Sequence, residues 1–268
     1  MNALRRNTSA DFSAIAADYD SSRFLPRSIV NDLVQRLLNI AVLHQGMAGL
    51  DAGCGTGCLT IPFGEAGICM TGLDISEKML ERARANAVSL PHVTFRHADV
   101  QRIHDFHVRY DFCVVSKLFQ HVGSWECAAQ NLTSLLRNPG LLILINERGA
   151  FRNSVRLKFS EIARANKFEF SYKGCSNIET VIDYFVALGF CVEDLPLPRI
   201  EWDFRISYDA AFGHLERKLF AEFWDLTSTQ YRQVLTETRS WIDEQPSGGH
   251  TEEKMSPHLD VHLLRKLN

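Results

Sequence analysis

The sequence lacks the features that would place it in several specialised classes of protein. No apolar run approaches the ~18 residues that a membrane-spanning helix needs, and the N-terminus has no apolar segment of the signal-peptide type. Charge of neither sign dominates, because 29 Lys and Arg face 32 Asp and Glu, a net charge of −3. We therefore expect a cytoplasmic protein with no membrane partner, and the missing basic excess argues against a nucleic-acid partner.

The cysteines form neither a disulfide framework nor a metal site. The chain has 7 cysteines, an odd number, and none of them forms a Cys-x-x-Cys pair. Clustered Cys and His ligands, which zinc requires, are also missing. Some cysteines lie in apolar runs, as Cys113 does between Phe112 and Val114. We therefore expect reduced, mostly buried thiols and no metal cofactor.

The sequence does contain short apolar runs, and these alternate with stretches that have helical spacing. The runs of strand length are 47–52, 69–73, 93–95, 112–115, 141–145, 190–193 and 258–264. The helix-like stretches are 28–43, 76–88, 125–137 and 177–188. Strands that alternate with helices indicate βαβ units and a parallel sheet. We therefore predict an α/β fold with a mostly parallel seven-stranded sheet and helices on both of its faces.

The chain of 268 residues has the length of one domain with an elaboration. Residues 196–256 form a long polar and aromatic segment in which Phe212, Leu215 and Leu219 fall at helical spacing. We expect one domain over residues 1–268, with N-terminal cap helices at about 1–45 and an insertion at 196–256. Both are expected to form a lid over the carboxyl edge of the sheet. The aromatic residues of this segment fit the core of a helical cap, and a ligand-binding cage is the alternative interpretation.

A glycine-rich turn with an acidic residue before it follows the first expected strand. The turn reads Leu50-Asp51-Ala52-Gly53-Cys54-Gly55-Thr56-Gly57. Gly53 and Gly55 permit positive φ and leave no Cβ to obstruct a ligand. Asp74 ends the second expected strand, the position at which a carboxylate of an open α/β sheet meets a ribose diol. These residues predict a ribose-containing cofactor at the carboxyl edge of the sheet.

The spacing of this turn disfavours a dinucleotide. A dinucleotide fingerprint is Gly-x-Gly-x-x-Gly, whereas here the third glycine comes one position early. Asp51 would also meet a pyrophosphate as a like charge, but it would attract an ammonium group. S-adenosylmethionine (SAM) carries an ammonium, a sulfonium, a carboxylate and a ribose, so it suits this pattern.

Four motifs carry a family resemblance. They are LDAGCGTG, TGLDISEKMLERAR, FRHADV and YDFCVVSKLFQHV. In this order and spacing they resemble the class I SAM-dependent methyltransferases of the small-molecule type, closely over about residues 10–150. The resemblance implies a Rossmann-like fold, SAM as cofactor, S-adenosylhomocysteine (SAH) as product, and methyl transfer to a small-molecule acceptor by in-line displacement.

The resemblance also implies a set of cofactor-binding residues. They are Tyr19, Arg23, Asp51, Gly53, Cys54, Gly55, Thr56, Gly57, Asp74, Ile75, Met79, Asp99, Val100 and Lys117. Asp74 would hold the ribose hydroxyls, while Ile75 and Met79 would flank the adenine. Asp99 would accept a hydrogen bond from the adenine amino group, although it has an alternative role as a turn residue.

The residues implied for the other end of the cofactor include the candidate catalytic residue. Tyr19 would lie near the methionine part and Arg23 near its carboxylate, and Tyr19 also fits ordinary packing on an apolar helix face. Lys117 replaces a residue that is commonly small or an amide, which leaves its side-chain role open. His121 is the candidate general base, since imidazole titrates near neutral pH; its alternative role is packing.

The sequence leaves other functions open. One is methylation of RNA or protein, and another is SAM binding without transfer, as in a regulatory module or a SAM-fold cyclase. The motifs do not separate these, because binding and transfer need the same cofactor pocket. The aromatic insertion and the overall charge favour a small, partly apolar acceptor.

Overall fold

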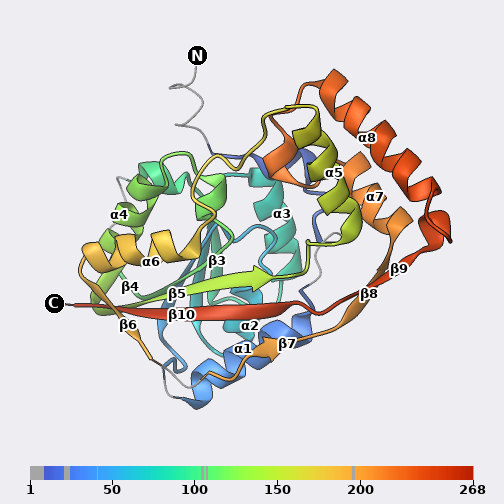
Figure 1. The fold of residues 1–268 in the computed structure, drawn as a ribbon. Coiled ribbons are helices and arrows are strands. Elements are labelled where there is room, and N and C mark those ends of the chain that lie inside the picture. Colours follow the sequence, from blue (N-terminus) through green and yellow to red (C-terminus); the bar gives the residue numbers. More distant parts are fainter. Residues whose placement is uncertain are drawn as a thin grey trace.

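A central β-sheet organises the part of the chain that the structure describes. This computed structural model describes residues 9–20, 25–40, 42–103, 106, 108–194 and 197–267. The main strands are β1 (Ala48–Ala52), β2 (Cys69–Asp74), β3 (Val93–His97), β4 (Tyr110–Ser116), β5 (Leu136–Arg148), β6 (Phe190–Glu193) and β10 (His258–Lys266). Their order is β3-β2-β1-β4-β5-β10-β6 (Figure 1). The predicted α/β fold with a mostly parallel sheet is confirmed.

The pairing pattern places the carboxyl ends of the first strands together. β1 pairs in parallel with β2 and β4, β2 with β3, and β4 with β5. β10 runs antiparallel between β5 and β6. A two-residue strand that the sequence pattern did not indicate, β7 (Ile200–Glu201), pairs with the start of β10 and makes the described sheet eight-stranded.

Helices cover both faces of the sheet. The helices that flank it are α1 (Arg27–Asn39), α2 (Thr60–Glu65), α3 (Glu77–Asn86), α4 (Trp125–Leu135) and α6 (Ile178–Ala187). Because side chains alternate along a strand, Leu141, Ile143 and Ile145 of β5 pack with α1 and α2 on one face. Leu142 and Leu144 pack with α4 and α6 on the other. The predicted helices on both faces are therefore present.

Two predicted helix ends differ from the structure. The pattern at 125–137 predicted two further helical residues, but α4 ends at Leu135 and β5 begins at Leu136. Pro139 follows closely and cannot continue a helix. The first helix, expected over 28–43, ends at Asn39.

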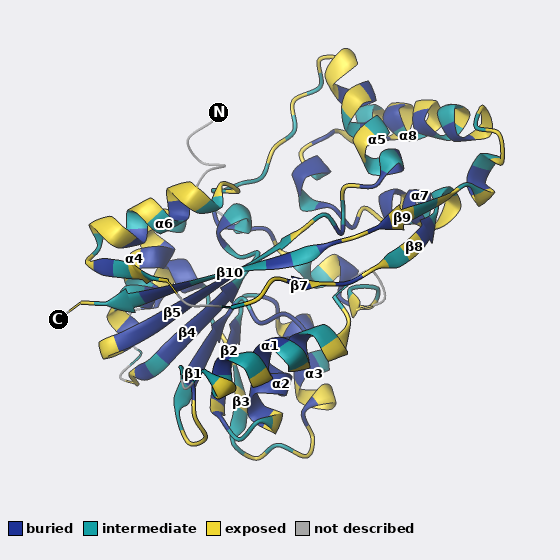
Figure 2. Ribbon diagram, turned by 60° about the horizontal axis from the view of Figure 1, so that its bottom comes forward, coloured by how far each residue is buried: buried dark blue, intermediate teal, exposed yellow. Residues whose placement is uncertain are grey.

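A second unit with its own core lies beyond the carboxyl end of β5 (Figures 1 and 2). It contains α5 (Ser154–Ala165), β8 (Phe204–Ser207), α7 (Tyr208–Glu216), the 3₁₀ helix η6 (Ala221–Phe223), α8 (Ser228–Asp243) and β9 (Glu252–Met255). We call this unit the cap. Its core joins Phe159 of α5 to Leu215 of α7 and Val234 of α8.

The cap contains one helix from outside the expected insertion and a small sheet of its own. α5 belongs to it, although the sequence pattern placed the insertion at 196–256, and β8 pairs with β9 in a two-stranded sheet. The role of the cap as a lid stays a prediction. In the described ranges no helix is long and apolar enough to cross a membrane.

Candidate active site

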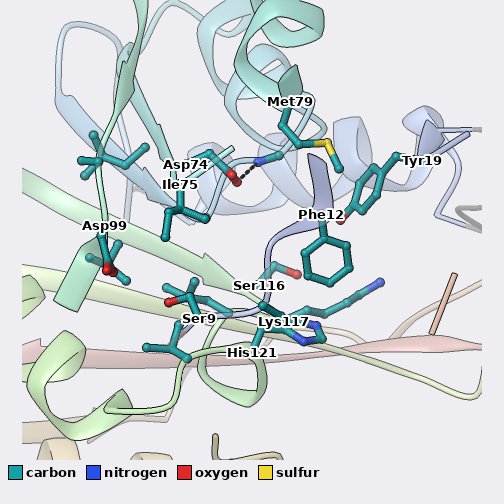
Figure 3. Close-up of a pocket in the computed structure, with 18 residues that line it drawn as sticks. Ser9, Phe12, Tyr19, Asp74, Ile75, Met79, Asp99, Ser116, Lys117 and His121 are labelled. Atoms are coloured by element: carbon teal, nitrogen blue, oxygen red, sulfur yellow. Dashed lines mark hydrogen bonds between the residues drawn. The ribbon is translucent and has the colours of Figure 1, made fainter. Parts of the chain in front are cut away.

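A cleft of about 710 Å³, open to solvent, lies at the carboxyl ends of β1 to β4 (Figure 3). The residues that line it are Ser9, Ala10, Phe12, Tyr19, Gly53, Gly55, Leu73, Asp74, Ile75, Met79, Ala98, Asp99, Val100, Ser116, Lys117, Leu118, His121 and Val122. The cleft thus has the position expected of a cofactor site in an open α/β sheet.

The glycine turn forms the floor of this cleft. Gly53 and Gly55 have φ of +76° and +54°, which is backbone that favours glycine. The backbone N–H groups of Gly53 and Cys54 both donate to the carbonyl of Leu73, at 2.8 Å, and hold the turn against the end of β2. A Cβ on Gly55 would point toward the ring of Tyr19, 3.6 Å away. A side chain at position 55 would therefore fill the space beside Tyr19 that glycine leaves open at the edge of the cleft.

Asp74 connects the turn to the start of α3. Its Oδ2 accepts from the N–H of Gly55 at 2.9 Å, and its Oδ1 accepts from the N–H of Ser76 at 2.8 Å. Burial raises the pKa of Asp74, and these backbone hydrogen bonds oppose that rise. Each carboxylate oxygen has a further lone pair, so the carboxylate can accept from a ligand diol while it holds the turn.

Asp51 lies one layer deeper. It is 2% exposed and accepts from Oγ1 of Thr60 at 2.5 Å. Burial raises the pKa of Asp51 to about 7, hydrogen bonds from Thr60 lower it, and the charge of Asp74 raises it. Asp51 lines an adjoining cavity of about 530 Å³ that shares Tyr19, Gly53, Ser116 and Lys117 with the main cleft. An elongated ligand can therefore lie across both cavities.

The loop after β3 closes one end of the cleft (Figure 3). Asp99 caps the 3₁₀ helix η4 (Val100–Arg102) and accepts from the N–H of Gln101 at 3.0 Å. The buried side chain of Gln101 donates to Oγ of Ser9 at 2.9 Å and accepts from the N–H of Ser124 at 2.8 Å. Asp99 therefore fills the turn role and also lines the cleft.

Lys117 and His121 lie at the opposite end (Figure 3). Lys117 follows β4 with φ of +53°, a strained conformation for a residue with a side chain. Its Nζ pairs with Glu147, whose side chain is 1% exposed. Gln120 Nε2 lies 3.1 Å from Nε2 of His121, which is in position to accept from it.

An N-terminal segment, residues 9–20, covers the cleft. The N–H of Ala10 donates to the carbonyl of His121 at 2.8 Å, and Oγ1 of Thr56 donates to Asp20 at 2.5 Å. Phe12 projects over the cleft beside Lys117 and His121 (Figure 3). The sequence motifs gave no signal for Ser9, Ala10 or Phe12, because their place depends on how this segment folds back.

The structure brings most of the predicted site together. The predicted residues that line the cleft are Tyr19, Gly53, Gly55, Asp74, Ile75, Met79, Asp99, Val100, Lys117 and His121. Asp51 and Cys54 line the adjoining cavity. Thr56 instead bonds Asp20, and the N–H of Gly57 donates to the carbonyl of Cys54 at 2.9 Å. Arg23 lies outside the described residues. The cofactor roles themselves stay predictions.

Comparison with known proteins bears on this site. Residues 50–140 match the family model of a methyltransferase domain. Malonyl-[acyl-carrier protein] O-methyltransferase of Serratia marcescens is 31% identical over 139 residues, which are 52% of this chain and 51% of the relative. The chain thus spans about half the length of the curated relatives it matches.

Comparison with solved structures confirms the predicted class I methyltransferase fold. YcgJ of Bacillus subtilis has a TM-score of 0.58 at 15% identity, covering 88% of this chain and 98% of its own. The [4+2]-cyclase SpnF has a TM-score of 0.51 at 16% identity, covering 88% of this chain and 81% of its own. Because a cyclase shares the fold, the fold alone does not decide the reaction.

Proposed function

We propose that this protein is a SAM-dependent methyltransferase that acts on a small-molecule acceptor. The observation that supports it most is the setting of Asp74, which holds the Gly55 turn and faces the cleft. A carboxylate at the end of β2 beside a glycine turn is the arrangement that holds a ribose diol in open α/β sheets. The methyltransferase domain match over residues 50–140 includes this part of the chain.

The residues present fit SAM along the whole cleft. Ile75, Met79 and Val100 provide apolar contacts for an adenine, and Asp99 accepts from its amino group. Asp74 takes the ribose hydroxyls, which are the donors that its remaining lone pairs require. In the adjoining cavity, the buried carboxylate of Asp51 suits an ammonium group. With SAM as the ligand, no pyrophosphate has to lie beside the carboxylate of Asp51, as it would with a dinucleotide.

Bound SAM supplies a methyl group that its sulfonium charge already activates for displacement by a nucleophile. The chain therefore contributes mainly binding and orientation. The 9–20 segment covers the cleft and limits the access of water. His121 takes a proton from acceptors that must lose one, and Lys117 places a positive charge at the same end.

The acceptor end suits a small molecule with an apolar part. Phe12, Tyr19 and His121 present rings to the cleft there. The relative from Serratia marcescens is named as an O-methyltransferase, which supports oxygen as the first acceptor atom to test.

The test is transfer of labelled methyl from SAM in the presence of a metabolite extract. We expect label in the small-molecule fraction with the wild-type protein, and much less label with Asp74→Ala at a SAM concentration that does not saturate the variant. Label in RNA or protein instead would contradict the small-molecule acceptor. Tight SAM binding with no label in any fraction would contradict methyl transfer and favour a regulatory module or a cyclase.

A further inference from the structure

The cap reaches the acceptor end of the cleft by two routes of contact. Both begin at the 3₁₀ helix η6, the part of the cap that follows Phe220. One route passes from Glu222 through Arg156 to Tyr172, which packs on His121. The other passes from Trp224, which directly follows η6, to Phe12. They meet because Phe12 also packs on His121.

A buried ion pair anchors the first route. Arg156 Nε donates to Glu222 Oε1 at 3.0 Å, and Arg156 Nη2 donates to the hydroxyl of Tyr172 at 3.2 Å. Nη1 donates to the carbonyl of Phe151 at 2.8 Å, and the guanidinium lies over the Phe220 ring at 4.3 Å. The side chains of Arg156 and Glu222 are only 16% and 10% exposed. A guanidinium with this many directed contacts has one orientation, so it fixes the hydroxyl of Tyr172.

A close backbone approach brings Tyr172 onto His121. The N–H of Gly174 donates to the carbonyl of Gln120 at 3.0 Å. A Cβ on Gly174 would lie 2.1 Å from the carbonyl oxygens of Phe119 and Val122, so only glycine fits there. The ring of Tyr172 then meets the His121 imidazole edge-on, with centroids 5.5 Å apart.

The second route reaches the imidazole through Phe12. Trp224 Nε1 donates to the carbonyl of Lys218 at 2.7 Å, which fixes the indole within the cap. Its ring lies 4.9 Å from that of Phe12, and Phe12 lies 4.9 Å from His121 at an interplanar angle of 77°. Phe12 and His121 line the cleft, whereas Tyr172 and Trp224 are not among the described residues that line it.

We propose that Tyr172 and Trp224 are positioning residues for the acceptor end of the cleft. They act through His121 and Phe12, whose rings they hold in the orientation in which an acceptor meets the methyl donor. This inference rests on the proposed function. In this proposal, η6 and its neighbours set the orientation of the acceptor. They do not affect cofactor binding, because neither positioning residue reaches the Asp74 end of the cleft.

The test uses two variants, and in both of them an aromatic ring remains in contact with His121. Tyr172→Phe keeps the ring on His121 but loses the bond from Arg156, and Trp224→Leu removes a ring that packs on Phe12. Trp241→Leu is the matched control, because Trp241 stacks on Tyr208 elsewhere in the cap. Trp224→Phe keeps a ring on Phe12 and is the conservative variant that should behave like wild type; if Trp224→Leu does not fold, Tyr172→Phe carries the test. SAH affinity is measured by calorimetry, and the His121 imidazole by NMR of histidine-labelled protein with SAH bound.

We expect SAH affinity within threefold of wild type in every variant. The His121 signal should broaden or double in Tyr172→Phe and Trp224→Leu, and stay single in Trp241→Leu and Trp224→Phe. With the acceptor fraction from the labelled-methyl assay, kcat should fall roughly ten- to hundredfold in the first two variants while the KM for SAM is unchanged.

The two possible failures are distinguishable. An unchanged His121 signal and unchanged kcat in both variants, with SAH bound normally, would overturn the positioning role and leave the cofactor assignment standing. Equal changes in the Trp241→Leu control would also overturn it, because a general loosening of the cap would then explain them. A wild-type protein that does not bind SAH would instead overturn the proposed function.

Discussion

Replacing Asp74 by alanine perturbs the cleft in two ways that can be measured separately. The change removes the carboxylate that faces the ligand. It also leaves the N–H groups of Gly55 and Ser76 without their acceptor, which lies at 2.9 Å and 2.8 Å in the wild type. The first effect weakens cofactor binding, and the second loosens the turn and the start of α3.

The expected magnitudes follow from these bonds. Loss of the charge-assisted hydrogen bonds to the ribose costs ~1.5–3 kcal/mol of binding free energy. That loss corresponds to a dissociation constant for SAH that rises roughly 10- to 150-fold. Loss of two backbone hydrogen bonds costs about 1–3 kcal/mol of the free energy of unfolding. The low end is expected, since burial raises the pKa of Asp74 and its removal relieves that desolvation.

Calorimetric titration with SAH measures the first effect, and urea unfolding measures the second. Asp111→Ala is the matched control. Asp111 accepts from the N–H of Ala48 at 2.7 Å and pairs with Arg137 at the amino ends of β1 and β4, away from the cleft. The control should lose stability and keep SAH affinity. A folded Asp74→Ala protein with SAH affinity within twofold of wild type would refute the assignment of Asp74 to the ribose.

Three further predictions concern other residues of the site. Gly55→Val should abolish SAH binding in a folded protein. A φ of +54° costs a branched residue ~1–2 kcal/mol, and the valine side chain would point toward Tyr19. Normal SAH binding by this variant would show that the turn is misplaced. Burial raises the pKa of Asp51 from 3.8 to about 7. Between these two pH values, Asp51 therefore keeps a proton in the folded protein that it has lost in the unfolded chain. Stability should therefore fall as pH rises from about 4 to 7, and unfolding curves of Asp51→Asn should show a flatter decline; an equal slope in both proteins would contradict this. His121→Asn should lower turnover by ~10²–10⁴ and remove a pH limb near 6–7 if His121 is the base, whereas a loss under tenfold with the limb intact would assign it to packing.

Local patterns in the sequence were sufficient for the seven main strands of the sheet and for the placement of the glycine turn beside Asp74. Short-range geometry places the acid and the glycines of the turn, and it also places Asp74 at the end of the next strand. Parallel pairing of β1 with β2 then brings them to one edge without further information. The N-cap of α3, Ser76, likewise depends on residues within one helical turn, because it accepts from the N–H of Met79.

The rest of the site depends on contacts between distant segments, which no short pattern encodes. Ser9 reaches the cleft because Gln101 binds it across 92 positions of sequence. The cap packs Phe159 against Tyr231, so α5, which lies outside the expected insertion at 196–256, is part of the core of the cap. The left-handed backbone of Lys117 and its ion pair with Glu147 likewise require the ends of β4 and β5 to be placed first.

The most direct test of the central claim is a crystal structure of the protein with SAH bound. The account predicts the adenine between Ile75 and Asp99, both ribose hydroxyls on the carboxylate of Asp74, and the sulfur directed toward His121. SAH bound in the reverse direction, or at a position away from Asp74, would contradict the assignment of the cleft.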